Sequence, residues 1–112
     1  MKPTAGLGLL GLGLKAGSVV VGTTGVRAAL RRGDLALIVL ASDLSQRTEE
    51  KVARLAHGTG IPVLVGPSSR ELGQRLGRDE IQAVGVRDPR LADGLRECWS
   101  SRQPQEKEQG TG

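Results

Sequence analysis

The stretch that decides the fold is residues 22–33 (GTTGVRAALRRG), which is followed at once by an apolar run at residues 35–41 and by Asp43. Val26, Ala29 and Leu30 recur at the spacing of one helical face, and Gly33 is a typical helix terminator. A second stretch, residues 61–73 (IPVLVGPSSRELG), begins with another apolar run and continues into a helical pattern. Continuous apolar runs are typical of strands that are covered on both faces. Each stretch therefore predicts a helix and a buried strand joined by a short polar loop.

Outward from these stretches, the same signals predict strands that alternate with helices. The expected strands are residues 18–21, 35–41, 61–65 and 81–86. The expected helices are residues 5–15 and those that begin at a Thr23 or Thr24 cap, at Ser45, at a capping box of Ser68 and Glu71, and at Asp88 with Pro89. This alternation predicts an α/β fold, a single-domain three-layer α/β/α sandwich with a central mixed sheet of about four strands. We expect it to span residues 1–99, with residues 100–112 as a disordered polar tail.

The first helix carries conflicting signals. Leu7, Leu10 and Leu14 fit one helical face, whereas glycines at positions 6, 8, 11 and 13 disfavour a helix. We therefore expect a helix that is held by packing rather than by propensity.

Composition limits the kinds of partner. The chain contains one Trp and no Tyr or Phe, so we expect a core of Leu, Val, Ile and Ala. Folds that stack nucleic-acid bases on aromatic rings are thereby disfavoured. Before Asp34 the chain carries five basic residues and no acid, while the rest carries 11 basic and 12 acidic residues. A cationic first third favours a polyanionic partner.

The remaining features argue for a cytoplasmic protein without enzymatic chemistry. Cys98 is the only cysteine, so no internal disulfide is possible. The pattern GLGLLG at residues 6–11 has no preceding strand, which a dinucleotide site requires. His57 is the only histidine, and Glu49 with Glu50 suits a first helical turn better than an acid/base pair. We expect no catalytic residue, metal or cofactor.

Two loops are candidates for binding. Residues 22–25 precede a helix N-terminus, where free backbone N–H groups suit phosphate, and glycines allow close approach. Residues 66–70 form a second strand-to-helix loop, which we also expect to offer free donors. If the strands at residues 35–41 and 61–65 are parallel neighbours, Ser42, Asp43 and residues 66–70 meet at one end of the sheet.

Taken in order, these motifs resemble the kink-turn-binding ribosomal protein family of the L7Ae/L30e type. The resemblance runs from about Leu9 to Leu95. It rests on Gly22, the run Ala29-Leu30, the pair Arg32-Gly33, Asp43, Ile61-Pro62, Pro67-Ser68, Leu72-Gly73, the strand at residues 84–86 and Asp88-Pro89. The chain is similar to divergent, bacterial-type members.

The resemblance implies binding of sharply bent, structured RNA of ribosomal origin. It implies that the RNA contacts the loop and helix after the first strand and the loop before the Ser68 helix. The implied RNA-binding residues, together with nearby cations, are Lys15, Gly22, Thr23, Thr24, Gly25, Arg27, Arg31, Asp43, Gly66, Pro67, Ser68, Ser69 and Arg70. Where the family has base-reading Asn, Glu and Lys, this chain has Thr24, Gly25 and Ala28. Each missing side-chain contact removes roughly 1–3 kcal/mol of base discrimination. Phosphate contacts by the cations remain.

Two other functions stay open. The same fold can serve as a protein-interaction module of the translation machinery, or as the RNA-substrate domain of a modification enzyme. The RNA-binding function implies a cytoplasmic monomer that is associated with the ribosome.

Overall fold

The computed structural model describes residues 3–99, so the predicted tail at residues 100–112 lies outside the described residues. Four strands form one mixed sheet: β1 (Val19–Val21), β2 (Leu37–Leu40), β3 (Val63–Val65) and β4 (Ala83–Val86). Their order across the sheet is β1-β4-β2-β3. β2 and β3 are parallel, as predicted, whereas β4 is antiparallel to both β1 and β2. Strands β1, β2 and β3 therefore point the same way.

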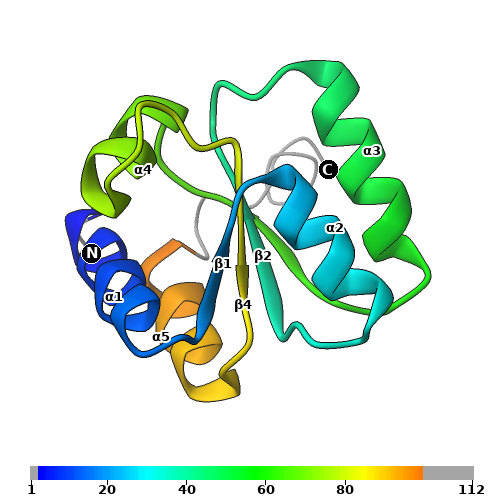
Figure 1. Cartoon of the computed structure of the whole chain (residues 1–112), viewed down its shortest axis with the longest axis horizontal. Helices are drawn as coiled ribbons and strands as arrows, with labels where there is room; N and C mark the ends of the chain where they lie inside the picture. Colours follow the sequence, from blue (N-terminus) through cyan, green and yellow to red (C-terminus); the bar gives the residue numbers. More distant parts are fainter. Residues whose placement is uncertain (1–2, 100–112) are drawn as a thin grey trace, which may run out of the picture.

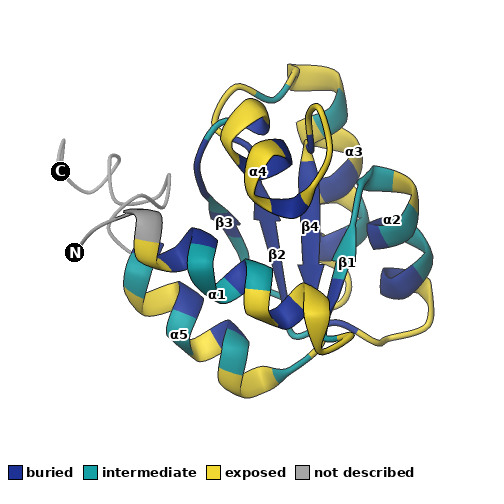
Figure 2. Cartoon of the chain, turned by 60° about the vertical axis from the view of Figure 1, so that its left-hand side comes forward, coloured by how far each residue is buried: buried dark blue, intermediate teal, exposed yellow. Residues whose placement is uncertain are grey.

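Helices cover both faces of the sheet, which confirms the predicted α/β/α sandwich. α1 (Pro3–Lys15), α4 (Ser69–Leu76) and α5 (Pro89–Trp99) lie on one face, and α2 (Thr23–Arg31) and α3 (Gln46–His57) on the other (Figure 1). The two faces hold separate hydrophobic clusters, because successive strand residues point to opposite sides. All residues of β2 and β4 are buried, as Figure 2 shows.

Helix α1 is held by its contacts with α5, as expected from its poor propensity. A Cβ atom on Gly6 would overlap the ring of Trp99, and one on Gly13 would overlap Leu91 and lie 2.7 Å from a methyl of Val19. These glycines let the two helices approach closely. The predicted leucine face is wrong in one position, since Leu14 is 36% exposed while Leu7 and Leu10 are buried.

The core is not purely aliphatic, contrary to the prediction from composition. Trp99, the last residue of α5, is fully buried and packs between α1 and the sheet near Gly66. Its indole Nε1 has no hydrogen-bond partner among the described residues. Trp99 escaped prediction because it borders the polar segment at residue 100.

Most predicted helix boundaries are confirmed. Ser45 accepts from the Thr48 N–H, Ser68 and Glu71 form the predicted capping box, and Asp88 accepts from the Arg90 N–H at the start of α5. Within residues 3–99, every helix is too short or too polar to cross a lipid bilayer.

Candidate nucleic-acid interface

One end of the sheet gathers both predicted binding loops. The carboxyl ends of β1, β2 and β3 lead into residues 22–25, 42–43 and 66–70, and the chain enters β4 at the same end. The prediction that Ser42, Asp43 and residues 66–70 meet is confirmed, and residues 22–25 reach the same edge. We call this end, comprising residues 22–25, 42–43, 66–70 and 78–82, the loop edge.

Backbone hydrogen bonds connect the segments of the loop edge into one unit. The Gly22 N–H donates to the Ala83 carbonyl at 2.9 Å, and the Ala41 N–H donates to the Gln82 carbonyl at 3.0 Å. The Ser42 N–H donates to the Pro67 carbonyl at 2.9 Å. These bonds hold all four segments in a fixed relation before any ligand arrives, which lowers the ordering cost of binding.

The first turn of α2 is open for a ligand. The predicted Thr23 or Thr24 cap is wrong, because Gly22 is the N-cap, with φ 94° and ψ 154°, and no side chain caps the helix. The N-cap is a glycine, which has no side chain, and both Thr residues already lie inside the helix. The N–H of Val26 donates to Gly22, which leaves those of Thr23, Thr24 and Gly25 without an intrahelical acceptor. Thr24 is exposed and Thr23 and Gly25 are half-buried.

The second predicted loop differs, because its donors are already used. The Gly66 N–H donates to the Leu40 carbonyl, Pro67 has no N–H, and the Ser68 N–H donates to Glu71 Oε1. The Ser69 N–H donates to Asp43 Oδ1 at 2.8 Å. The expectation of free backbone donors at residues 66–69 is therefore wrong: the loop is tied to its own helix and to Asp43.

Asp43 anchors this loop. Its carboxylate accepts from both the N–H and the hydroxyl of Ser69, which is only 6% exposed. The Ser69 N–H bond holds the pKa of Asp43 below its ordinary value of 3.8. Asp43 thus ties the end of β2 to the first turn of α4, and an RNA contact by Asp43 stays a prediction.

The predicted cations do not all lie together. Arg27 is half-buried one turn into α2, and its Nε is buried without a hydrogen-bond partner among the described residues. Arg31 lies eight residues beyond Thr23, about 12 Å further along the helix axis. Lys15 lines a separate hollow with Arg75 and Gly77. Arg70, in the first turn of α4, is an exposed residue of the loop edge.

The sequence prediction missed the turn at residues 78–82. β4 enters the sheet between β1 and β2, so this turn lies between the two predicted loops. The turn packs against Gly73, where a Cβ would come within 2.7 Å of the backbone oxygens of Arg78 and Asp79. The Leu72-Gly73 motif was the available signal, because a buried helical glycine marks close approach of another backbone.

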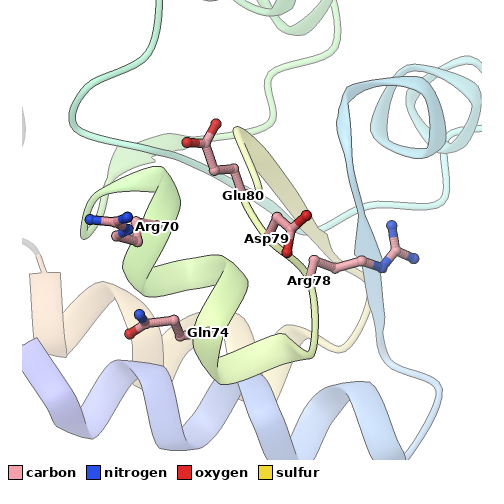
Figure 3. Close-up of a pocket in the computed structure, with 5 residues that line it drawn as sticks. All are labelled: Arg70, Gln74, Arg78, Asp79 and Glu80. Carbon is pink, nitrogen blue, oxygen red and sulfur yellow. The ribbon is translucent and has the colours of Figure 1, made fainter.

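Two hollows flank this turn. One, of about 510 Å³, is lined by Arg70, Gln74, Arg78, Asp79 and Glu80, and Figure 3 shows Arg78 reaching toward β1. The other, of about 250 Å³, is lined by Val21, Gly22, Thr23, Arg78, Glu80, Ile81 and Gln82. Residues 3–99 contain no group of three or more His, Cys, Asp or Glu side chains that could hold a metal ion.

Comparisons with known proteins agree with the fold. A structure described as a protein with unknown function from Bacillus halodurans has a TM-score of 0.78 and 30% identity, over 83% of this chain and 94% of that one. The Giardia lamblia 15.5kD RNA binding protein has a TM-score of 0.71 over 91% of this chain and 88% of that one; at 16% identity it shows a shared fold. A search of curated protein sequences found no significant match.

The sequence profile of one family matches most of the chain. The profile is described as the ribosomal protein L7Ae/L30e/S12e/Gadd45 family, and it matches residues 4–95. That range includes all five helices and all four strands except the ends of α1 and α5. This continuous match over most of the chain leads to one conclusion: the chain belongs to the ribosomal protein L7Ae/L30e/S12e/Gadd45 family.

Proposed function

We propose that this protein is a non-catalytic RNA-binding protein that binds structured RNA of the kink-turn type at the loop edge. The observation that carries the proposal is the uncapped first turn of α2, where Thr23, Thr24 and Gly25 offer N–H groups to an anion. Arg27 stands one turn further on, with a buried Nε that lacks a partner among the described residues. A phosphate at this position would accept hydrogen bonds from the N–H groups of Thr23, Thr24 and Gly25, which have no acceptor within the helix.

The family description and one structural neighbour support the same class of ligand. The family is described as ribosomal, and the Giardia lamblia protein of similar fold is described as RNA-binding. Thr24, Gly25 and Ala28 lack the long polar side chains of the base-reading Asn, Glu and Lys that the resemblance implies at these positions. We therefore expect α2 to position the RNA backbone rather than to read its bases.

The remaining parts of the proposal concern geometry and location. Arg70 is the exposed member of the second loop, so it contacts RNA as a cation while residues 66–69 hold the loop in place. Lys15 and Arg31 act at longer range through their charge. The protein works as a monomer that is associated with ribosomal RNA in the cytoplasm.

The test is binding of purified protein to a kink-turn RNA and to a straight duplex of equal length, over a salt titration. Arg27→Glu is the test variant, and Arg90→Glu is the matched control. Arg90 carries the same charge change, but it is exposed in the first turn of α5, at the opposite end of the sheet. We expect Arg27→Glu to weaken binding and to lower the slope of log affinity against log salt by about 1.

Each outcome has a definite meaning. Preference for the kink-turn together with a loss confined to Arg27→Glu supports the proposal. Equal binding of both RNAs would mean that the protein makes only a general electrostatic contact with RNA. Equal losses in Arg27→Glu and Arg90→Glu would refute the loop edge as the site.

One observation favours the alternative, a protein-interaction module of the translation machinery. Leu12 is 65% exposed and, with Leu14, lines an apolar hollow of about 430 Å³ between α1 and the end of α4. Exposed apolar surface of this kind is typical of protein contacts. Absence of binding to either RNA would make this alternative the leading one.

A further inference from the structure

The outer face of α1 is apolar, unlike the outer faces of the four other helices. Residues 5–14 are Ala, Gly or Leu without exception, and Lys15 is the one charged residue of the helix. Leu7 and Leu10 are buried in the core, whereas Leu12 and Leu14 are exposed. The helices α2, α3, α4 and α5 each expose charged side chains instead. An apolar face of this kind is typical of a surface that another molecule covers.

Two glycines of α1 have no role in the internal packing of the domain. A Cβ on Gly8 would meet nothing within 4 Å, and one on Gly11 would make an ordinary contact, 3.6 Å from Cδ of Arg75. Gly6 and Gly13 differ, because side chains of α5 and β1 occupy the space beside them. Glycine lowers the stability of a helix relative to alanine, so the fold alone favours alanine at positions 8 and 11. Glycine there leaves room for the backbone of a molecule outside the domain.

The exposed glycines and leucines line a groove between α1 and α4, which lie side by side (Figure 2). One part of the groove is the hollow of about 430 Å³ that contains Leu12 and Leu14. A second hollow of about 350 Å³ is lined by Leu7, Glu71 and Gln74, and Arg75 lines both. We call this feature, between residues 7–15 and residues 71–77, the α1–α4 groove. It shares no residue with the loop edge.

The available charge in the α1–α4 groove is positive. Lys15 and Arg75 are exposed, and neither takes part in an ion pair within residues 3–99. Glu71 is the one acidic residue that lines the groove, and its Oε1 already accepts from the N–H and the hydroxyl of Ser68. An apolar surface beside two unpaired cations is complementary to a ligand that carries both apolar groups and carboxylates.

Other occupants fit this surface less well. A second copy of the chain would bring the same two cations against Lys15 and Arg75. Residues 100–112 of this chain contain no Leu, Ile, Val, Met or aromatic residue that could fill an apolar groove. A lipid bilayer is flat, whereas this surface is hollowed between two helices. A phosphate backbone would leave Leu12 without an apolar contact.

We propose that the α1–α4 groove docks a protein partner, which inserts an amphipathic helix with an apolar stripe and flanking carboxylates. Recognition of a helix in a groove uses apolar anchors that recur at helical spacing on one face of the ligand. Residues 7–15 extend about 12 Å along the axis of α1, which matches about two turns of a partner helix. The partner backbone approaches Gly8 and Gly11, its anchors contact Leu12, and its carboxylates meet the two cations. This inference goes beyond RNA binding and does not depend on it.

The test is a selection of helix-forming sequences from a display library of random peptides on the full-length protein. The enriched peptides are then synthesised, and their affinities are measured by fluorescence anisotropy. We expect them to carry apolar residues at helical spacing with Asp or Glu between them, and to gain helical circular dichroism on binding. Leu12→Ala and Arg75→Glu should each weaken binding at least about tenfold.

Arg54→Glu is the matched control for Arg75→Glu. Both residues are exposed cations in the last turn of a helix, but Arg54 lies on α3, across the sheet from the groove. Peptide affinity should be unchanged in Arg54→Glu. Peptides with Lys in place of their acidic residues should prefer Arg75→Glu to the wild type, which a merely structural role of Arg75 would not produce.

Gly8→Ala separates binding from folding. Its methyl group meets nothing inside the domain, so the free protein should melt at a higher temperature than the wild type. The same methyl group occupies the space that the partner backbone needs, so peptide affinity should fall severalfold. A loss of stability cannot explain such a change.

Several results would overturn the inference. One is the absence of enriched peptides, and another is enrichment of peptides whose affinity is unchanged in Leu12→Ala, Arg75→Glu and Gly8→Ala. A dimer in sedimentation equilibrium that Leu12→Ala dissociates would assign the groove to a second copy. Sedimentation with anionic phospholipid vesicles that Leu12→Ala abolishes, without peptide binding, would assign it to a membrane. The RNA titration with Arg27→Glu does not use this groove, so either proposal can fail while the other stands.

Discussion

Two glycines of α1 allow a sharp test of how this helix is held. A Cβ on Gly6 would overlap the indole of Trp99, with Cε2 at 2.6 Å, whereas a Cβ on Gly8 would meet nothing within 4 Å. Gly6→Ala and Gly8→Ala gain the same helix propensity, about 1 kcal/mol each. The difference between the two variants therefore isolates the packing contact.

The size of this difference follows from the burial of Trp99. The ring is fully buried and touches the Gly66 region on its other side, so it cannot move outward without cost. Overpacking of such a site costs roughly 1–3 kcal/mol. In a domain of this size each kcal/mol shifts the Tm by about 4–8 °C. We expect Gly8→Ala to melt above the wild type, and Gly6→Ala to melt at least about 4 °C below Gly8→Ala.

Thermal unfolding followed by circular dichroism measures both variants, and urea unfolding supplies the free energies. Near-ultraviolet circular dichroism reports directly on Trp99, the only aromatic residue. Equal stability of the two variants, with an unchanged Trp signal in Gly6→Ala, would refute the close packing of α1 against Trp99.

Three further predictions concern the loop edge. Because Ser69 lowers the pKa of Asp43, the stability that this carboxylate adds is present above its ordinary pKa of 3.8 and is lost as the pH falls through the lower folded pKa. Asp43→Asn should therefore lower the Tm at pH 7, and the Tm difference from wild type should close in acid. A constant Tm difference in a pH series of melting curves would contradict this. Ser68→Ala removes half of a capping box and should cost about 1 kcal/mol in urea unfolding; no change would mean that Asp43 alone holds the start of α4. Gly22→Ala forces a side chain into a positive-φ conformation, so we expect a loss of about 1–3 kcal/mol, and wild-type stability in the same unfolding assay would show that the junction from β1 to α2 relaxes freely.

Local signals were enough for most of the secondary structure. The Ser68–Glu71 box, the Ser45 cap and the Asp88-Pro89 pair each act within about one helical turn, so a reader of the sequence can recognise them without knowing the fold. The apolar runs identified β2 and β3 for the same reason, although the hydrogen-bonded strands are shorter than the runs. The Thr cap of α2 failed because both Thr residues follow Gly22, whose unusual backbone conformation no propensity describes.

The candidate site was predictable only in part. Gly22–Gly25 and Gly66–Arg70 were found as loops that precede helices, but which of their N–H groups stay free depends on distant residues. Asp43 occupies the Ser69 N–H across 26 positions of sequence, and nothing in either local pattern indicates that bond. The two loops look alike in sequence, yet the first turn of α2 keeps free N–H groups, whereas those of the loop before α4 are already hydrogen-bonded.

The order of residues along the chain determined the fold class, the helices and most of their caps, because these depend on spacing and on contacts within a few positions. The tertiary structure alone decided that β4 enters between β1 and β2, that Trp99 closes the core against Gly6, and that Gly22, Glu80 and Gln82 line one hollow. Each of these joins segments that lie far apart in the chain. Such contacts form only when the whole core packs, and their partners are chosen by shape and free space rather than by sequence spacing.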